Sequence, residues 1–392
     1  MNGREVPQAV IVATARTPIG RAYKGSLVDV KADDLAGLAI DAVMSRVPEV
    51  DRASVEDVMV GCALTHHEQG YNVARPGSLL GGMPETVPAT TVNRFCASSL
   101  QTIRMAFHAI KHGEGDVYLA AGVESTTRTY GKGFASEDLN PRFTDPDRDD
   151  FINQVYIPMG NTAENVAERY GITRERQDEF AKRSQDLAVE AQKNGFFANE
   201  ITPVVVPDGR TISDDDGPRP NTTLEKLSEL PTIFKPDGTV TAGNACPLND
   251  GAAAVLVMSA TRADQLGLTP MARIIASSVA GLAPEYMGMG PVHAVRKVLD
   301  QTGMSLGDID IVELNEAFAA QVLACVDQIG IDIDRLNPHG GAIALGHPFG
   351  MTGARIMGTL LNGLRALDGT YGLETMCVGG GQGMAMIVER LS

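Results

Sequence analysis

The sequence of 392 residues contains no tryptophan, and only 5% of its residues are aromatic. It is also poor in basic residues, since 33 Lys and Arg stand against 49 Asp and Glu and the formal net charge is −16. Nucleic acids and anionic membrane surfaces are bound by clustered basic side chains, so this balance argues against both as partners. A bound anion would have to be met by a few local groups.

Long hydrophobic runs are also missing. The apolar stretch at residues 252–258 is far shorter than the roughly 20 residues that span a bilayer, and residues 1–5 lack the apolar core of a signal peptide. The five cysteines, at positions 62, 96, 246, 325 and 377, include no CxxC pair, so neither a disulfide framework nor a metal site is predicted. We expect a cytoplasmic protein without a membrane span, with some cysteines in the core and others in chemistry.

Glycine, by contrast, is abundant at 42 residues, as in α/β proteins with many tight strand–helix turns. Short β-branched segments alternate with longer helical patterns, which predicts layered α/β structure with largely buried, parallel strands. Strands are expected at residues 8–15, 57–61, 90–92, 116–121, 272–280, 310–314, 371–378 and 384–389. Helices are expected at 33–46, 97–111, 174–194, 291–301, 316–329 and 353–366.

The two ends of the chain resemble each other in layout. The strand at 57–61 precedes a turn bearing Cys96, and the strand at 310–314 precedes a turn bearing His347; a helix and a further strand follow each turn. A duplicated α/β unit explains this parallel, and two ordinary α/β domains with similar loops are the alternative. The middle of the chain is more polar. We therefore expect an N-terminal α/β half at residues 1–122, completed by about 245–270, an inserted domain at 123–244 and a C-terminal α/β half at 271–392.

Cys96 lies in the sequence NRFCASS, residues 93–99, where a strand is expected to pass through a short turn into a helix. The N–H groups and the macrodipole at a helix N-terminus favour an anion, so we expect a lowered thiol pKa at this position. Such a thiol is well placed as a nucleophile. A buried structural cysteine is the alternative.

Two glycine-rich segments carry further candidates. Residues 340–355, GGAIALGHPFGMTGAR, hold His347 on a rigid turn between a glycine and a proline, which favours a functional histidine over a core one. Residues 377–383, CVGGGQG, place Cys377 at a strand end and offer backbone N–H groups to an oxyanion. A nucleotide-phosphate turn is the alternative, but a strand rather than a helix is expected to follow, which argues against a dinucleotide fold.

Asn315 and Glu316 follow the strand at 310–314, and helix capping is sufficient to explain both. Taken with the other three segments, however, they place two cysteines, a histidine and an asparagine at strand ends, where α/β sheets build active sites. With no metal-ligand set, this combination indicates covalent thiol chemistry on a carbonyl.

Five ordered motifs resemble the thiolases over essentially the whole chain. The resemblance implies two duplicated α/β halves, layered α-β-α-β-α, with an inserted loop domain that covers the substrate, in a homodimer or homotetramer. It implies an acyltransferase that cleaves a 3-ketoacyl-CoA by thiolysis, or in reverse condenses acyl-CoA units. Acyl-CoA and CoA would be the substrates, with no permanently bound cofactor and no metal, and other β-oxidation enzymes are expected partners. The motifs are NRFCASS at 93–99, TAGNACPLNDGAAA at 241–254, NEAFA at 315–319, GGAIALGHPFGMTGAR at 340–355 and CVGGGQG at 377–383.

The resemblance also implies roles for individual residues. Cys96 would be the acylated nucleophile, and His347 would be its base and a donor to the thioester oxygen. Asn315 would hold a water in the same oxyanion hole. Cys377 would be the second acid–base group, and the N–H groups of Cys96 and Gly379 would form the oxyanion hole of the acyl-enzyme.

The expected substrate-binding residues are Met159, Cys246 and Phe318. Cys246 and the proline after it replace a commoner Ser-Gly near the pantetheine, and Ser99 stands where the family usually has glycine. Residues 156–158 lack the histidine that acetoacetyl-CoA-forming members usually carry before Met159. These departures leave the acyl chain length open and favour a substrate longer than acetoacetyl-CoA.

Two other functions fit the same resemblance. A decarboxylating ketosynthase-type condensing enzyme usually combines one cysteine with two histidines, or with a histidine and an asparagine, and Cys377 counts against it. A non-catalytic relative that binds acyl-CoA or lipid would not need Cys96, His347, Asn315 and Cys377 together.

Overall fold

The structure is a computed structural model of the chain and describes residues 6–132, 136–143, 145, 147, 152 and 154–392. Residues 1–5, where the sequence lacks the apolar core of a signal peptide, lie outside the described residues. Within the described ranges, no helix combines the length and the hydrophobicity needed to cross a bilayer.

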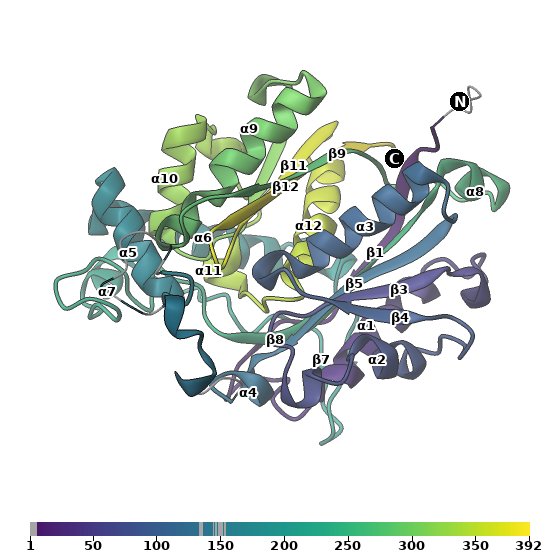
Figure 1. Cartoon of the computed structure of the whole chain (residues 1–392), viewed down its shortest axis with the longest axis horizontal. Helices are drawn as coiled ribbons and strands as arrows, with labels where there is room; N and C mark the ends of the chain where they lie inside the picture. Colours follow the sequence, from purple (N-terminus) through teal and green to yellow (C-terminus); the bar gives the residue numbers. More distant parts are fainter. Residues whose placement is uncertain (1–5, 133–135, 144, 146, 148–151, 153) are drawn as a thin grey trace.

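One sheet runs in the order β10-β11-β12-β9-β1-β8-β5-β3-β4, with β2 (Gly20–Arg21) paired to β8. β1 and β9 pair through Val10 and Ile11 of β1, so the sheet consists of two half-sheets that meet at a short contact (Figure 1). The strands are β1 (Ala9–Arg16), β3 (Asp57–Gly61), β4 (Ala89–Val92), β5 (Val117–Ser125), β8 (Asn249–Ser259), β9 (Ala272–Gly281), β10 (Ile311–Leu314), β11 (Tyr371–Val378) and β12 (Gln382–Arg390).

The two half-sheets share one strand order and one set of directions. β5 is parallel to β3 and antiparallel to β8, just as β11 is parallel to β10 and antiparallel to β12. β4, parallel to β3, has its counterpart in the parallel bridge between Val312 and Leu336. This repeat confirms the duplicated α/β unit. The expectation of largely parallel strands is wrong, because the last strand of each half, β8 or β12, returns antiparallel to its neighbours.

Helices complete the expected α-β-α-β-α layering. α1 (Ala32–Ser45) and α2 (Ala74–Leu80) cover the outer face of the N-terminal half-sheet. α9 (Gly290–Thr302) and α10 (Ala319–Ile329) cover the outer side of the C-terminal half. α3 (Ser98–His112) and α12 (Thr352–Ala366) contact each other between the half-sheets (Figure 1). A Cβ atom at Gly353 would lie 2.3 Å from the backbone nitrogen of Leu100, so glycine permits this close approach.

Between β5 and β8 the chain leaves the sheet for a long inserted segment, which packs over the C-terminal half through contacts of α5 and α6 with α10. The domain bounds given above stay a prediction. The elements of the segment are α4 (Thr126–Thr129), α5 (Met159–Tyr170), α6 (Arg174–Lys193), β6 (Val204–Val205), β7 (Thr211–Ile212) and α7 (Leu224–Ser228). Short helices α8 (Ala260–Gln265) and α11 (Ala342–Leu345) lie elsewhere in the chain.

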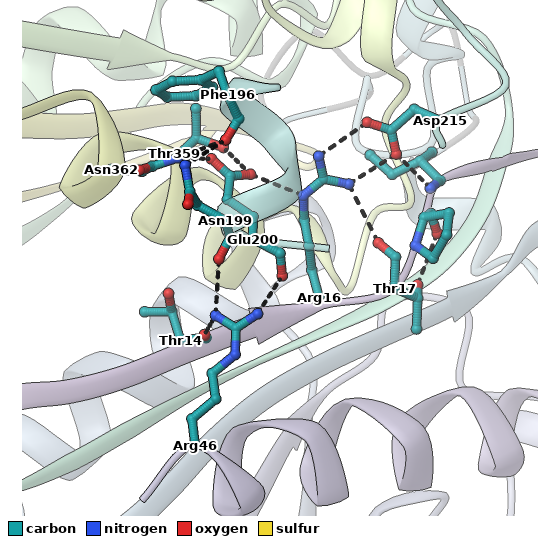
Figure 2. Close-up of polar contacts among 12 residues, drawn as sticks. Thr14, Arg16, Thr17, Arg46, Phe196, Asn199, Glu200, Asp215, Thr359 and Asn362 are labelled. Atoms are coloured by element: carbon teal, nitrogen blue, oxygen red, sulfur yellow. Dashed lines mark hydrogen bonds and ion pairs between the residues drawn. The ribbon is translucent and has the colours of Figure 1, made fainter. Parts of the chain in front are cut away.

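Arg16, at the end of β1, holds the returning part of this segment (Figure 2). Its buried guanidinium donates to Glu200 at 2.9 Å and to both carboxylate oxygens of Asp215 at 2.8 and 2.9 Å. Arg46, the residue that follows α1, donates to the carbonyls of Thr14 and Glu200. Breaking a buried ion pair by removing one partner typically costs about 3–5 kcal/mol, so this network fixes the inserted segment to the N-terminal half.

Candidate active site

Cys96 lies on the 3₁₀ helix Phe95–Ala97, between β4 and α3. Phe95 has a φ of 44°, in the left-handed region that residues other than glycine rarely occupy. Side chains of the same motif hold this turn. Asn93 Oδ1 accepts from the Phe95 N–H at 2.8 Å, while Ser98 Oγ accepts from the Arg94 N–H at 2.9 Å and donates to the Phe95 carbonyl at 2.6 Å. The motif thus supplies the polar groups that stabilise its own strained turn.

The Cys96 thiol is enclosed by groups of both halves. Burial, followed by the negative charge of Glu124, raises its pKa to about 12, although the backbone N–H groups of Cys96 and Gly379 act in the opposite direction. The expected lowering of this pKa at a helix N-terminus is wrong, because desolvation outweighs those donors. Cys96 is therefore a neutral thiol near pH 7, and ionising it requires a base.

His347 provides a neutral imidazole in the C-terminal half. The residue is 1% exposed, and burial, with a smaller contribution from the charge of Arg355, lowers its pKa to about 3. The backbone N–H of His347 donates to Asn249 Oδ1 at 3.0 Å. On the imidazole ring, Nδ1 lies 2.6 Å from Thr352 Oγ1 and Nε2 lies 3.3 Å from Asn315 Nδ2. The side chains of His347 and Asn315, predicted as one site, are therefore in direct contact.

Asn315 and Glu316 do not cap a helix, because α10 begins only at Ala319. Asn315 instead continues β10, donating its N–H to the Thr375 carbonyl at 3.0 Å. Its side-chain Oδ1 is buried and has no hydrogen-bond partner among the described residues. Glu316 ties the inserted segment to the loop before His347: its carboxylate accepts hydrogen bonds from the Ser184 hydroxyl, the Asn337 amide and the Ile343 N–H.

Cys377 lies on β11, two residues before a glycine turn that leads directly into β12. Gly380 and Gly381 have φ values of 75° and 80°, and a Cβ atom at Gly381 would lie 2.2 Å from the Leu282 carbonyl oxygen, so the turn requires glycine. The Cys377 thiol is fully buried, and burial raises its pKa well above the usual range. The thiols of Cys96 and Cys246 add to this increase, which places the three cysteines within electrostatic reach of one another.

The structure brings the expected pocket residues beside this strand end. Met159, at the start of α5, and Phe318 pack in one small apolar cluster with Cys377. The Met159 sulfur lies 3.6 Å from the position that a Cβ atom on Gly379 would occupy. Cys246 is joined to the neighbouring loop by a hydrogen bond from its N–H to the Ala317 carbonyl at 3.0 Å. That these residues bind substrate stays a prediction.

Sequence analysis did not identify Glu124, a buried carboxylate near the end of β5. It accepts hydrogen bonds from the N–H groups of Ala63, Leu64 and Gly350 at 3.0, 3.1 and 2.8 Å, and from Gln69 Nε2 at 2.6 Å. Glu124 therefore fastens the loop after β3 to the turn that follows His347. The sequence feature that could have identified Glu124 is that it is the single acidic residue within the apolar run at 117–125.

The two halves meet at these groups, because the 3₁₀ helix bearing Cys96 contacts both β11 and α12. One thiol with two backbone N–H donors, a neutral imidazole paired with an amide, and a second buried thiol form a set suited to covalent acyl chemistry. In the described part of the chain, no group of three or more His, Cys, Asp or Glu side chains is placed to hold a metal ion.

Comparison with known proteins gives matches over nearly the whole chain. Residues 9–261 match the family described as thiolase, N-terminal domain, and residues 268–390 match thiolase, C-terminal domain. The chain is 47% identical to the beta-ketoadipyl-CoA thiolase of Acinetobacter baylyi, over 98% of this chain and 99% of that protein. Among solved structures, it is similar to the dimeric peroxisomal thiolase of Saccharomyces cerevisiae (TM-score 0.92, 40% identity, 99% and 98% covered). It is also similar to human mitochondrial 3-ketoacyl-CoA thiolase in complex with CoA (TM-score 0.89, 38% identity, 99% of each chain covered).

Proposed function

The chain belongs to the thiolase family of acyltransferases, and on that premise we propose that it cleaves a 3-ketoacyl-CoA by thiolysis to acetyl-CoA and a shortened acyl-CoA. CoA is a substrate of this family and not a resident cofactor. The observation that carries the proposal is that the turn bearing Cys96 contacts both the strand of Cys377 and the helix after His347, so that groups of both halves surround one thiol.

The first half-reaction forms an acyl-enzyme. His347 Nε2 takes the Cys96 proton as the sulfur attacks the 3-keto carbon, because the high thiol pKa and the low imidazole pKa oppose an ion pair at rest. The C2–C3 bond then breaks, and acetyl-CoA leaves as an enolate. The charge on its thioester oxygen is stabilised by His347 and by a water held by Asn315, and a preorganised donor of this kind is typically worth about 3–4 kcal/mol.

Cys377 completes the cycle as the second acid–base group. It donates its proton to the carbanion of the leaving acetyl unit, and it then takes the thiol proton of incoming CoA. The CoA sulfur attacks the acyl group on Cys96, and the N–H groups of Cys96 and Gly379 stabilise the tetrahedral oxyanion. The bond from the acyl carbon to Cys96 then breaks, and the departing sulfur takes back the proton held by His347. Condensation of acyl-CoA units uses the same steps in reverse.

The side chains beside Cys377 favour an apolar acyl group. Met159 and Phe318 are apolar, and the Phe318 ring packs edge-to-face on Phe234 with centroids 6.2 Å apart. We therefore propose 3-ketoacyl-CoA substrates longer than acetoacetyl-CoA, in β-oxidation. 3-Ketoadipyl-CoA is the second candidate, because relatives 45–47% identical to this chain are named beta-ketoadipyl-CoA thiolases.

A thiolysis assay across substrates tests the proposal. We expect kcat/KM to be higher for straight-chain or branched apolar 3-ketoacyl-CoA than for acetoacetyl-CoA. If kcat/KM is higher for 3-ketoadipyl-CoA, this thioester and not an apolar 3-ketoacyl-CoA is the preferred substrate. A folded enzyme that cleaves none of these thioesters, with the Cys96→Ala variant as the blank, would overturn the proposed function.

We also propose a cytoplasmic homodimer or homotetramer built from the three parts given under sequence analysis. A solved structure similar to this chain is described as dimeric, which supports assembly without giving the number of subunits. Light scattering on the purified protein distinguishes the dimer from the tetramer.

A further inference from the structure

The His347 side chain has one contact that the steps above do not use. Its Nδ1 lies 2.6 Å from the hydroxyl oxygen of Thr352, the first residue of α12, and both residues are buried. The same hydroxyl donates to the Pro348 carbonyl at 2.8 Å. A hydroxyl carries a single proton, so one that donates to Pro348 can only accept from Nδ1. His347 then carries its proton on Nδ1, and its Nε2 has a lone pair.

The other ring nitrogen agrees with this assignment. The amide nitrogen of Asn315, which carries two hydrogens, lies 3.3 Å from His347 Nε2. In the opposite tautomer an Nε2–H would face this amide donor, and two donors in contact repel each other. With the proton on Nδ1, the Asn315 amide donates to the Nε2 lone pair.

The N-terminal half shows the same use of a hydroxyl. Ser98, the first residue of α3, accepts a hydrogen bond from the Arg94 N–H at 2.9 Å and donates to the Phe95 carbonyl at 2.6 Å. Each central helix thus begins with a hydroxyl that accepts from the preceding turn and donates to a carbonyl of that turn. In the C-terminal half, this hydroxyl belongs to Thr352, and the group that donates to it is His347.

We infer that Thr352 is a positioning residue, which holds His347 in the Nδ1–H tautomer so that Nε2 can take the proton of Cys96. The inference rests on the proposed function for its catalytic consequence. When Nε2 receives the proton, the imidazolium still donates its Nδ1–H to Thr352. Because this acceptor is a neutral hydroxyl and not a carboxylate, the imidazolium stays acidic and returns its proton readily, and burial acts in the same direction.

Three variants test whether the Thr352 hydroxyl supports His347 in thiolysis. Thr352→Val keeps the shape of the side chain but removes the hydroxyl, and we expect kcat for thiolysis to fall by about 10–100-fold with KM nearly unchanged, as for loss of a group that orients a functional histidine. Thr352→Ser restores the hydroxyl and should restore most of kcat. Thr359→Val is the matched control, because it removes a buried hydroxyl that donates to Glu200 from the same helix. It should lower stability and leave kcat unchanged.

Nitrogen NMR of the unliganded wild-type protein tests the tautomer without any variant. In protein labelled with ¹⁵N-histidine, the His347 signals, identified by their loss in His347→Gln, should show a protonated Nδ1 and an unprotonated Nε2. A protonated Nε2, or wild-type kcat in folded Thr352→Val, would overturn the inference. Failure of the proposed function would instead appear as absence of thiolysis in the wild type, and it would leave the tautomer measurement readable.

Discussion

The two halves of the molecule share one strand order but contribute unequally to the site. In the N-terminal half, the turn before the central helix carries Cys96 next to Phe95, whose side chain is 47% exposed. In the C-terminal half, the corresponding turn carries His347 at 1% exposure, and the strand end carries fully buried Cys377. The N-terminal half supplies the proposed nucleophile beside a solvent-exposed ring, and the C-terminal half supplies acid–base groups that are buried. Desolvation is the largest cause of the pKa shift for Cys96, His347 and Cys377 alike.

The largest effect should come from exchanging the thiols of the two halves for hydroxyls. Cys96→Ser should lower kcat for thiolysis by about 10⁴-fold or more, because loss of a nucleophile removes the covalent route. Cys377→Ser should still form the acyl-enzyme slowly, detected by mass spectrometry as an adduct on Cys96. It should exchange the α-protons of acetyl-CoA with deuterated water poorly, since the base for that step is missing.

Cys325→Ser is the control for these variants. Cys325 is a buried thiol of the C-terminal half that donates to the Gly288 carbonyl, and we expect its variant to turn over normally. An acyl adduct on Cys377, or unchanged α-proton exchange in Cys377→Ser, would show that the division between the halves is wrong.

Much of this division could be predicted from the sequence. Cys96, His347 and Cys377 stand out because each lies beside residues that favour tight turns, and the predicted strand at 371–378 coincides with β11. β8 was not predicted as a strand, because its residues are buried on both faces and show no alternation of polar and apolar side chains. Local patterns therefore locate candidate residues more reliably than they locate central strands.

Tertiary contacts account for the remaining errors. Glu124 was missed because one of its hydrogen-bond donors, Gly350, is 226 residues away in the chain. The pKa of Cys96 was predicted with the wrong sign because a helix N-terminus can be recognised in sequence, whereas burial by the other half cannot. Helix capping stood as an alternative for Asn315 because the sequence does not show that the residue continues the pairing of β10 with β11.

The cores of the halves differ at one pair of strand positions. Glu313 of β10 is aligned with Glu374 of β11, whereas none of the aligned pairs between β3 and β5 brings two carboxyl groups together. Burial raises the pKa of Glu313 to about 8 and that of Glu374 well above its usual range, and the opposing charge of Arg355 is too weak to reverse this. The C-terminal half therefore holds carboxyl groups that are protonated over part of the neutral range.

The buried carboxyl groups of the C-terminal half predict that the free energy of unfolding depends on pH, an effect smaller than the loss of either thiol. Between about pH 4.5 and 8 the folded state holds on Glu313 a proton that the unfolded state has released, and the raised pKa of Glu374 acts in the same direction. The free energy of unfolding should therefore fall as the pH rises through this window, by up to about 1.4 kcal/mol per pH unit for each carboxyl. Glu374→Gln should make this decline shallower in urea titrations at several pH values, and the surface variant Glu229→Gln should not. Parallel profiles for the wild type and Glu374→Gln would contradict the prediction.

The smallest effect concerns the contact that joins the halves. Ser99 Oγ, in the first turn of α3, accepts the N–H of Ala354, in the first turn of α12, at 2.9 Å. The N–H groups of a first helical turn have no partner within their own helix, so Ser99 caps a helix of the other half. Ser99→Ala should lower the free energy of unfolding by about 1–3 kcal/mol, the cost of an unsatisfied buried donor, and Ser99→Gly by slightly more. In urea titrations, Ser228→Ala, which removes an exposed hydroxyl from α7, is the control. Equal stability of Ser99→Ala and the wild type would contradict the cap. A fall in kcat without loss of stability would instead show that this bond sets the spacing between the turns of Cys96 and His347.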